Sequence, residues 1–187
     1  DADNDGDVDL VGMSWTGLIA YWLNDGTGRM TLATHTHISP WPGYVSLQVQ
    51  TADVDGDGDA DLAVSQAYTR APVMLYLNDG TGHFTDVSAT HMPSTTTGGL
   101  VLRFGDLDED GDLDLLNTVS YGTIAPGWEE VLLNDGIGHF THDRSGAVLP
   151  TVSNGTQWDI VVQDLDDDGD VDLMIPDLGG GYTPNCR

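Results

Sequence analysis

Short apolar runs recur along the whole chain, separated by clusters of aspartate and glycine. Runs with apolar residues at alternate positions precede three aspartate clusters, at 45–49, 100–104 and 160–162, and further apolar runs follow the clusters, as at 62–64 and 173–175. Alternation of this kind is typical of half-buried β-strands. No stretch of a dozen residues carries the 3.6-residue apolar period of an amphipathic helix. The pattern therefore predicts an all-β protein in which helices are nearly absent.

Two motifs repeat in step along this pattern. The first is a decamer rich in aspartate: DADNDGDVDL at 1–10, DVDGDGDADL at 53–62, DLDEDGDLDL at 106–115 and DLDDDGDVDL at 164–173. The second is LNDGTGRM at 23–30, LNDGTGHF at 77–84 and LNDGIGHF at 133–140. The glycines of the second motif favour a tight hairpin, after which Phe84 or Phe140 opens a further strand. One supersecondary unit is therefore repeated with a period of fifty to sixty residues.

Four antiparallel strands in a unit of about 40–50 residues predict a β-propeller blade. A β-sandwich also has short, evenly spaced strands, but it would not repeat the same loop and turn in register. We expect residues 1–40 to form a blade that lacks its first strand, 41–97 and 98–150 to form whole blades, and 151–187 to supply two strands of another. About three and a half blades are fewer than a closed ring of roughly 4–8. The expectation is a single partial propeller, completed by the rest of a longer chain or by a homo-oligomer.

The charge of the chain is strongly negative and unevenly distributed. There are 31 acidic residues against 5 basic ones, a formal net charge of −26, and 22 of the 31 lie in the four decamers. Because the charge is clustered between apolar runs, it favours cation-binding loops over a disordered chain. Binding to nucleic acid or to anionic membranes is disfavoured by repulsion. Membrane insertion is not expected, since no window reaches the roughly 18 apolar residues of a spanning helix.

The decamers have the donor pattern of a Ca²⁺ loop, since Ca²⁺ takes about 6–8 oxygen ligands and prefers carboxylates and carbonyls. Positions 1, 3 and 5 offer carboxylates, glycine at position 6 permits a sharp turn, position 7 offers its carbonyl, and the aspartate at position 9 closes the shell. Thiophilic or nitrogen-seeking metals would need cysteine or histidine, and Mg²⁺ favours a smaller octahedron. An EF-hand needs an acidic residue at position 12, where Gly12, Val64, Asn117 and Ile175 stand instead. The predicted ligands of up to four Ca²⁺ ions are Asp1, Asp3, Asp5, Asp7 and Asp9; Asp53, Asp55, Asp57, Asp59 and Asp61; Asp106, Asp108, Asp110, Asp112 and Asp114; and Asp164, Asp166, Asp168, Asp170 and Asp172.

The order D-x-D-x-D-G-x-x-D-L, apolar strand, L-N-D-G-x-G-x-F resembles the FG-GAP/VCBS repeat of integrin α-subunit-like β-propellers. The resemblance covers essentially the whole chain. It implies Ca²⁺ between the first two strands of each blade, held by the loop positions given above. It also implies an extracellular or cell-surface setting, in adhesins, lectins and non-catalytic parts of secreted enzymes. The first repeat departs from the pattern at Arg29 and Met30, where the others have His and Phe.

Other residues give weaker indications. The five tryptophans could stack on sugar rings, Trp41 and Trp128 most of all, although packing between blades explains most of them: Trp15, Trp22, Trp41, Trp128 and Trp158. His35 and His37 have metal-ligand spacing without a third ligand, and His83 and His139 recur at one position of the hairpin. Asn154 begins a sequon that is a glycosylation site if the source is a eukaryote and otherwise only a loop. Cys186 has no partner within the chain and either pairs outside it or is a free thiol.

No arrangement of residues indicates catalysis, so the chain is not expected to be an enzyme. The sequence predicts a calcium-stabilised, extracellular adhesion, binding or structural module. A carbohydrate-binding lectin, a self-assembling filament protein and the accessory propeller of a secreted enzyme remain alternatives. A glycan or a protein is the expected ligand.

Overall fold

The computed structural model describes residues 1–14, 19–38, 46–66, 72–94, 99–119, 128–144 and 159–174, and these form four antiparallel sheets. The first sheet contains β1 (Leu10–Met13), β2 (Ile19–Asn24) and β3 (Met30–Leu32). The second contains β4 (Ser46–Ala52), β5 (Asp61–Gln66), β6 (Met74–Asn78) and β7 (Phe84–Asp86). The third contains β8 (Val101–Gly105), β9 (Asp114–Val119), β10 (Trp128–Leu133) and β11 (Thr141–His142), and the fourth β12 (Val161–Gln163) and β13 (Asp172–Met174). In each sheet, strands that follow one another along the chain are hydrogen-bonded neighbours. The prediction of an all-β fold made of four-stranded antiparallel blades is confirmed.

The helical structure among the described residues is two single turns, α1 (Thr34–His37) and α2 (Ser88–His91), neither long enough to cross a membrane. They occupy the same place in successive repeats, directly after the last strand of a sheet. In each turn the first residue accepts a hydrogen bond from the strand beside it: Thr34 Oγ1 from the Tyr21 amide at 2.8 Å and Ser88 Oγ from the Leu75 amide at 2.9 Å. Each turn thereby closes the outer edge of its sheet.

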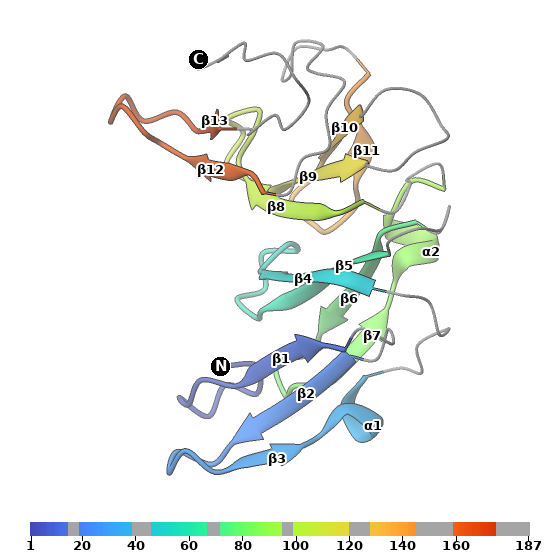
Figure 1. The fold of residues 1–187 in the computed structure, drawn as a ribbon, viewed down its shortest axis with the longest axis vertical. Coiled ribbons are helices and arrows are strands. Elements are labelled where there is room, and N and C mark those ends of the chain that lie inside the picture. Colours follow the sequence, from blue (N-terminus) through green and yellow to red (C-terminus); the bar gives the residue numbers. More distant parts are fainter. Residues whose placement is uncertain are drawn as a thin grey trace.

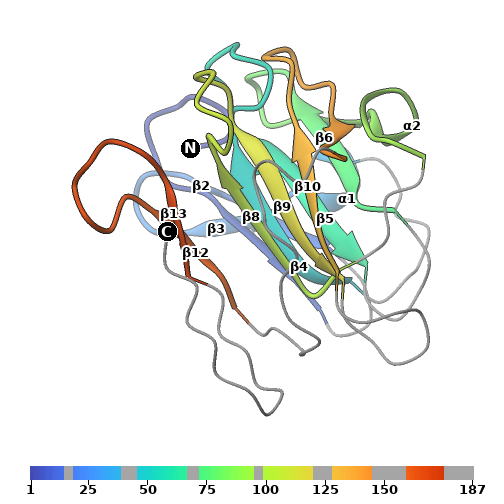
Figure 2. The same ribbon diagram turned by 90° about the horizontal axis from the view of Figure 1, so that it is seen from above.

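The four sheets stack face to face in chain order, from β1–β3 to β12–β13 (Figure 1). Strands β4, β8 and β12, each the first of its sheet, lie next to one another along the stack, and β1 lies beside β4. Seen from above, the successive sheets are rotated relative to one another, as blades of a propeller are (Figure 2). The chain thus forms a row of blades.

The hydrophobic core lies between the sheets in three clusters. Alternate residues of a strand face opposite neighbours: in β5, Leu62 and Val64 pack toward the first sheet, whereas Ala63 packs toward the third. The phenylalanine after each tight hairpin faces the preceding sheet, Phe84 in the first cluster and Phe140 in the second. The third cluster joins the last two sheets. Its buried members are Val101, Leu116, Val131 and Ile160.

The outer face of the first sheet has no neighbour among the described residues. Leu10, Trp22 and Leu32 are registered across β1, β2 and β3, and Leu10 and Leu32 are 50% and 56% exposed. In the second sheet the residues equivalent to Leu10 and Trp22 are Leu62 and Tyr76, which are 2% and 0% exposed because the first sheet covers them. The first sheet therefore presents a blade-packing face to solvent.

Candidate metal centres

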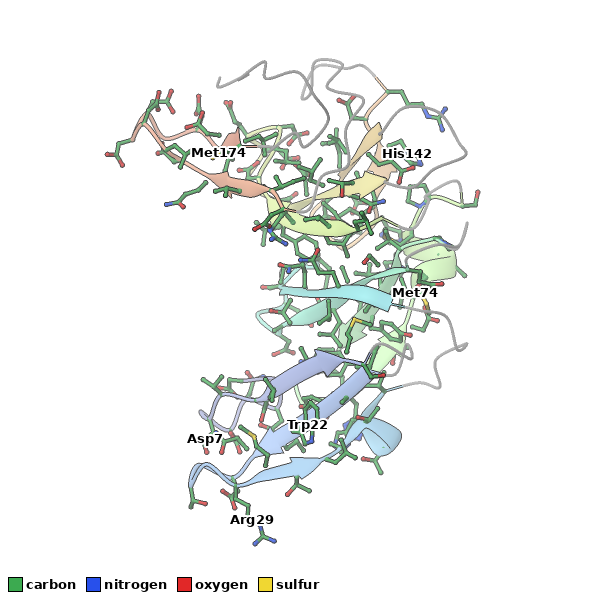
Figure 3. The ribbon with its side chains drawn as sticks, viewed as in Figure 1. Asp7, Trp22, Arg29, Met74, His142 and Met174 are labelled. Carbon is green, nitrogen blue, oxygen red and sulfur yellow. The ribbon has the colours of Figure 1, made fainter. Side chains whose placement is uncertain are left out.

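The four aspartate loops lie at the same end of the sheets, on the left of Figure 1. Three of them join the first and second strands of a sheet, and the loop at 1–9 leads into β1. The tight hairpins at 24–30 and 78–84 come to the same end, so that each loop lies beside the hairpin of its own sheet. Figure 3 shows this in the first sheet, where Asp7 and Arg29 lie on the loop and on the hairpin. The sequence repeat is therefore also a repeat in space.

The loops are held in shape by hydrogen bonds from their own backbone amides to their aspartates. The position 1 carboxylate accepts from the amide of the position 6 glycine, as Asp53 Oδ2 does from Gly58 at 3.0 Å, with counterparts at 3.1, 3.0 and 2.9 Å. The position 5 carboxylate accepts from the amide of position 7, as Asp57 Oδ1 does from Asp59 at 2.9 Å. In three of the loops the position 1 carboxylate also accepts an amide on its other oxygen, from Gly56, Asp110 or Asp168 at 2.8–3.2 Å. These bonds curl the chain around the carboxylates.

Backbone conformation at two loop positions makes this curl possible. The glycines at position 6 have φ between +94° and +100° in all four loops, so the sharp turn predicted there is confirmed: Gly6, Gly58, Gly111 and Gly169. Position 4 is also left-handed, with φ of 58° at Asn4, 75° at Gly56, 64° at Glu109 and 61° at Asp167. The second feature was not predicted, although Asn, Gly and Asp, which tolerate this region, occupy three of the four positions.

In every loop, three aspartates bring carboxylate oxygens within 4.8 Å of one another. The triads are Asp1, Asp3 and Asp5; Asp53, Asp55 and Asp57; Asp106, Asp108 and Asp114; and Asp164, Asp166 and Asp172. Two oxygens that ligate the same Ca²⁺ at about 2.3–2.6 Å can be at most roughly 5 Å apart. The donor set is oxygen only and the spread matches one such ion, so the residues present fit Ca²⁺. The twenty ligands predicted from sequence stay a prediction, of which the structure gathers these twelve.

The closing aspartates at position 9 have a second task that sequence reasoning missed. Asp61 is 1% exposed, and its Oδ1 accepts from the Asn78 amide at 2.8 Å while Oδ2 accepts from the Val54 amide at 3.0 Å. The same pair of bonds recurs at Asp9 and Asp114. The closing aspartate therefore ties its loop to the adjacent hairpin. The sequence signal that could have indicated this contact is the motif order, because an LNDG hairpin follows each of the first three aspartate loops.

The carboxylates at position 7 lie against the hairpin of their own sheet. A Cβ on Gly80 would stand 2.5 Å from Asp59 Oδ2, and one on Gly136 would stand 2.4 Å from Asp112 Oδ2. The first glycine of the DGxG turn is thus required by this close approach as well as by its positive φ. Because the position 7 carboxylate contacts the hairpin, the predicted metal ligand at this position is its backbone carbonyl.

The electrostatics of the loops favour a bound cation. Burial and the neighbouring carboxylate of Asp57 raise the pKa of Asp55, and burial raises the pKa of Asp61 to about 7. In the fourth loop the carboxylate of Asp168 raises the pKa of Asp166. The described salt bridges are Arg103 with Asp159 and His139 with Asp135, so no described cationic side chain neutralises a loop.

The histidines form two stacked pairs between sheets. His37 of α1 lies on His83, with ring centroids 4.2 Å apart, and His91 of α2 lies on His139 at 4.1 Å. The hairpin role predicted for His83 and His139 agrees with this packing. His37 has its Nδ1 2.6 Å from Thr36 Oγ1, and the side chain of His35 lies outside the described residues. Trp15, Trp41, Trp158, Asn154, Cys186 and the side chain of Trp128 also lie outside them.

Stacked antiparallel sheets of up to four strands, in which an acidic loop and a glycine hairpin recur in the same order, define a repeat protein of the propeller-blade type. The sequence model of the FG-GAP-like repeat matches residues 1–64 and 65–116. The matched segments contain the first three aspartate loops and the first two hairpins. The chain belongs to the FG-GAP-like repeat family, as its motifs predicted. A search of curated protein sequences found no match.

Proposed function

We propose that the chain is a calcium-stabilised, non-catalytic propeller segment that serves as a binding or structural module outside the cell. The observation that carries this proposal is the gathering of carboxylate oxygens within 4.8 Å in each of the four loops. Such a shell is repulsive without a cation, since acidic neighbours lie at every second position. The family membership supports the same function, because its repeats build modules of this architecture.

Calcium would change the charge balance where repulsion is greatest. One ion in each of the four triads adds eight positive charges, which takes the formal net charge from −26 to −18. Binding energy that is available only in the folded loop adds directly to the free energy of unfolding. We therefore expect folding and calcium binding to be strongly coupled.

A thermal melt in millimolar Ca²⁺ and in excess EGTA tests the proposal, together with isothermal titration of the apo-protein. The melting temperature should rise with calcium, and the titration should give four sites. Asp57→Asn should remove one site, since it takes an anionic oxygen from the second triad. Asp86→Asn, a charge change on β7 outside the loops, should leave four. A melting temperature equal in Ca²⁺ and EGTA contradicts the proposal.

The extracellular setting is the part of the proposal that rests on calcium chemistry. Loops with many exposed carboxylates suit the millimolar calcium outside cells, where modules bind with dissociation constants of roughly 10⁻⁴–10⁻³ M. A dissociation constant below about 1 µM would instead match a cytosolic sensor or buffer and would oppose this setting.

A second candidate function is self-assembly, which the exposed outer face of the first sheet favours. The partner proposed to cover this face is a second copy of the chain, which would dock through its last sheet. That sheet and its loop expose apolar residues, Met174 of β13 at 50% and Leu165 of the loop between β12 and β13 at 48%. Val54, the residue equivalent to Leu165 in the second loop, is 2% exposed under the third sheet, so a following blade is the natural cover for this position. Contacts between two different faces extend into rings or filaments.

Light scattering after size exclusion tests this candidate in saturating calcium. Leu10→Asp, on the outer face, should shift an oligomer toward monomer. Val8→Asp is the matched control, because Val8 is 74% exposed in the first loop rather than on the sheet. A wild-type protein that stays monomeric at about 100 µM, well above typical assembly constants, rules self-assembly out.

A further inference from the structure

The hairpins of the second and third sheets are wedged between two aspartate loops, their own and that of the preceding sheet. The side-chain amide of Asn78 donates to the Ala2 carbonyl of the first loop at 2.8 Å and to the Ala60 carbonyl of the second at 3.2 Å. Asn134 repeats this arrangement, donating to Val54 at 2.8 Å and to Leu113 at 3.2 Å. One asparagine therefore contacts two consecutive loops.

The same asparagines hold the closing aspartates through their backbone. The Asn78 amide donates to Asp61 Oδ1 at 2.8 Å, and the Asn134 amide donates to Asp114 Oδ1 at 2.8 Å. Asp61 in turn accepts from the Val54 amide, and the carbonyl of Val54 accepts from Asn134. An unbroken series of hydrogen bonds thus runs from the closing carboxylate of one loop to that of the next.

The series repeats at both junctions, and its bonds are buried at the second and partly buried at the first. Asn78 and Asn134 are 5% and 6% exposed, and Asp61 and Asp114 are 1% and 0% exposed. The first junction begins at Asp9, whose Oδ2 accepts from the Ala2 amide at 2.8 Å. Breaking buried hydrogen bonds of this kind costs free energy, so a shift in the position of one loop should also shift the neighbouring loop.

The first junction has an additional link. The side chain of Asn4 donates to Asp59 Oδ1 at 2.6 Å and to the Gly80 carbonyl at 3.2 Å. At the second junction the equivalent position is Gly56, which has no side chain to make this contact. The first two loops are therefore joined more extensively than the second and third.

We propose that Asn78 and Asn134 are positioning residues that couple neighbouring calcium loops, so that an ion bound in one loop favours binding in the next. The proposal rests on the calcium-binding function proposed above. Calcium held by the aspartates at positions 1 and 3 fixes the position 2 residue between them, whose amide donates to the closing aspartate. The carbonyl of the position 2 residue then holds the asparagine of the next hairpin, whose backbone aligns the next closing aspartate. The cost of ordering the second loop is reduced, and by linkage the coupling acts equally in both directions.

The first hairpin supplies a matched control. Asn24 holds its own closing aspartate through its backbone, at 2.9 Å from Asp9 Oδ1, and its side chain donates to the Val8 carbonyl of its own loop at 3.1 Å. Among the described residues it makes no bond to another aspartate loop. Asn24→Ala therefore removes the bond within a repeat, whereas Asn78→Ala and Asn134→Ala remove the bond between repeats as well.

A calcium titration of the apo-protein, measured by calorimetry, tests the coupling in the full chain. The wild type and Asn24→Ala should bind with a Hill coefficient greater than unity. Each bridging variant should bind less steeply, because it removes one of the two junctions, and the double variant should come nearest to unity, all of them keeping the four sites. Independent binding in the wild type, or an equal loss of steepness in Asn24→Ala, overturns the coupling. A protein that binds no calcium instead refutes the proposed function itself.

A second variant keeps the test valid if the bridging variants do not fold. Asp57→Asn empties the second loop while all asparagines stay in place. The affinity of the first and third loops for calcium should then fall about fivefold or more, the lower end of typical coupling. Unchanged affinities in those loops refute the coupling, whatever the bridging variants do.

Discussion

Phe84 and Met30 occupy the same position of two successive hairpins, and their replacement by alanine measures how much a covering sheet contributes. Phe84 is 4% exposed in the cluster between the first two sheets, and its ring meets Tyr21 edge-on, with centroids 5.5 Å apart and planes at 88°. Met30 is 43% exposed on the first sheet, which has no described sheet before it.

The expected magnitudes follow from this difference in burial. Phe84→Ala removes a buried ring and leaves a cavity, which costs about 3–5 kcal/mol of unfolding free energy. Part of this, about 0.5–1.5 kcal/mol, is the edge-to-face contact with Tyr21. Met30→Ala should cost about 1 kcal/mol or less, because much of its side chain is already in water. The two variants should differ by about 2–4 kcal/mol.

Urea denaturation in saturating calcium, monitored by circular dichroism, measures the loss of unfolding free energy in both variants. The loss is calculated from the shift of the midpoint and the slope of the transition. Phe84→Leu is the control for shape, and it should cost less than about 1.5 kcal/mol if packing volume dominates. Equal destabilisation by Phe84→Ala and Met30→Ala would refute the reasoning. It would mean that the outer face of the first sheet is covered in solution as fully as the inner one.

Three further outcomes are expected. Gly82→Ala should be more destabilising than Gly28→Ala in thermal melts, because both have positive φ but a Cβ on Gly82 would stand 2.6 Å from a tyrosine hydroxyl while Gly28 has open space. Arg103→Ala should speed proteolysis of β12–β13, since Arg103 Nε donates to the Ile160 carbonyl of the last sheet at 2.9 Å; an unchanged cleavage rate would count against this link. Burial and the stacked histidine hold the pKa of His91 below its ordinary value of 6.5, so the unfolded chain takes up the proton first and stability should decline as pH falls below about 6.5. His91→Phe should make the melting temperature less dependent on pH in that range.

Local features of the sequence were sufficient to predict the sheets and the clusters of the candidate site. The two-residue period places Leu62 and Val64 on one face of β5 and Ala63 on the other, and this depends only on the alternation of side chains along a strand. The turn at Gly58 depends on a residue that adopts positive φ. The gathering of Asp53, Asp55 and Asp57 follows from the same local curl.

Features that join distant repeats could not be predicted from a single sequence. Asn134 and Val54, the bridging pair of the second junction, are 80 residues apart, and no periodicity marks an asparagine as a bridge between loops. The histidine stacks likewise combine residues from different sheets. The turns α1 and α2 have four residues each, too few to show a helical period. What remained hidden was the packing between units, because it depends on tertiary contacts.

The second and third repeats have a different front and back: their hairpin asparagines, Asn78 and Asn134, donate to a carbonyl of the preceding loop. Such polarity restricts how a gene for this protein can lengthen or shorten. A duplication or deletion of one complete repeat, wherever its boundaries fall within the repeat, joins a front to a back and recreates the asparagine bridge between units. A change by half a repeat would bring two incompatible surfaces together. Evolution and protein engineering should therefore alter the number of blades in whole steps.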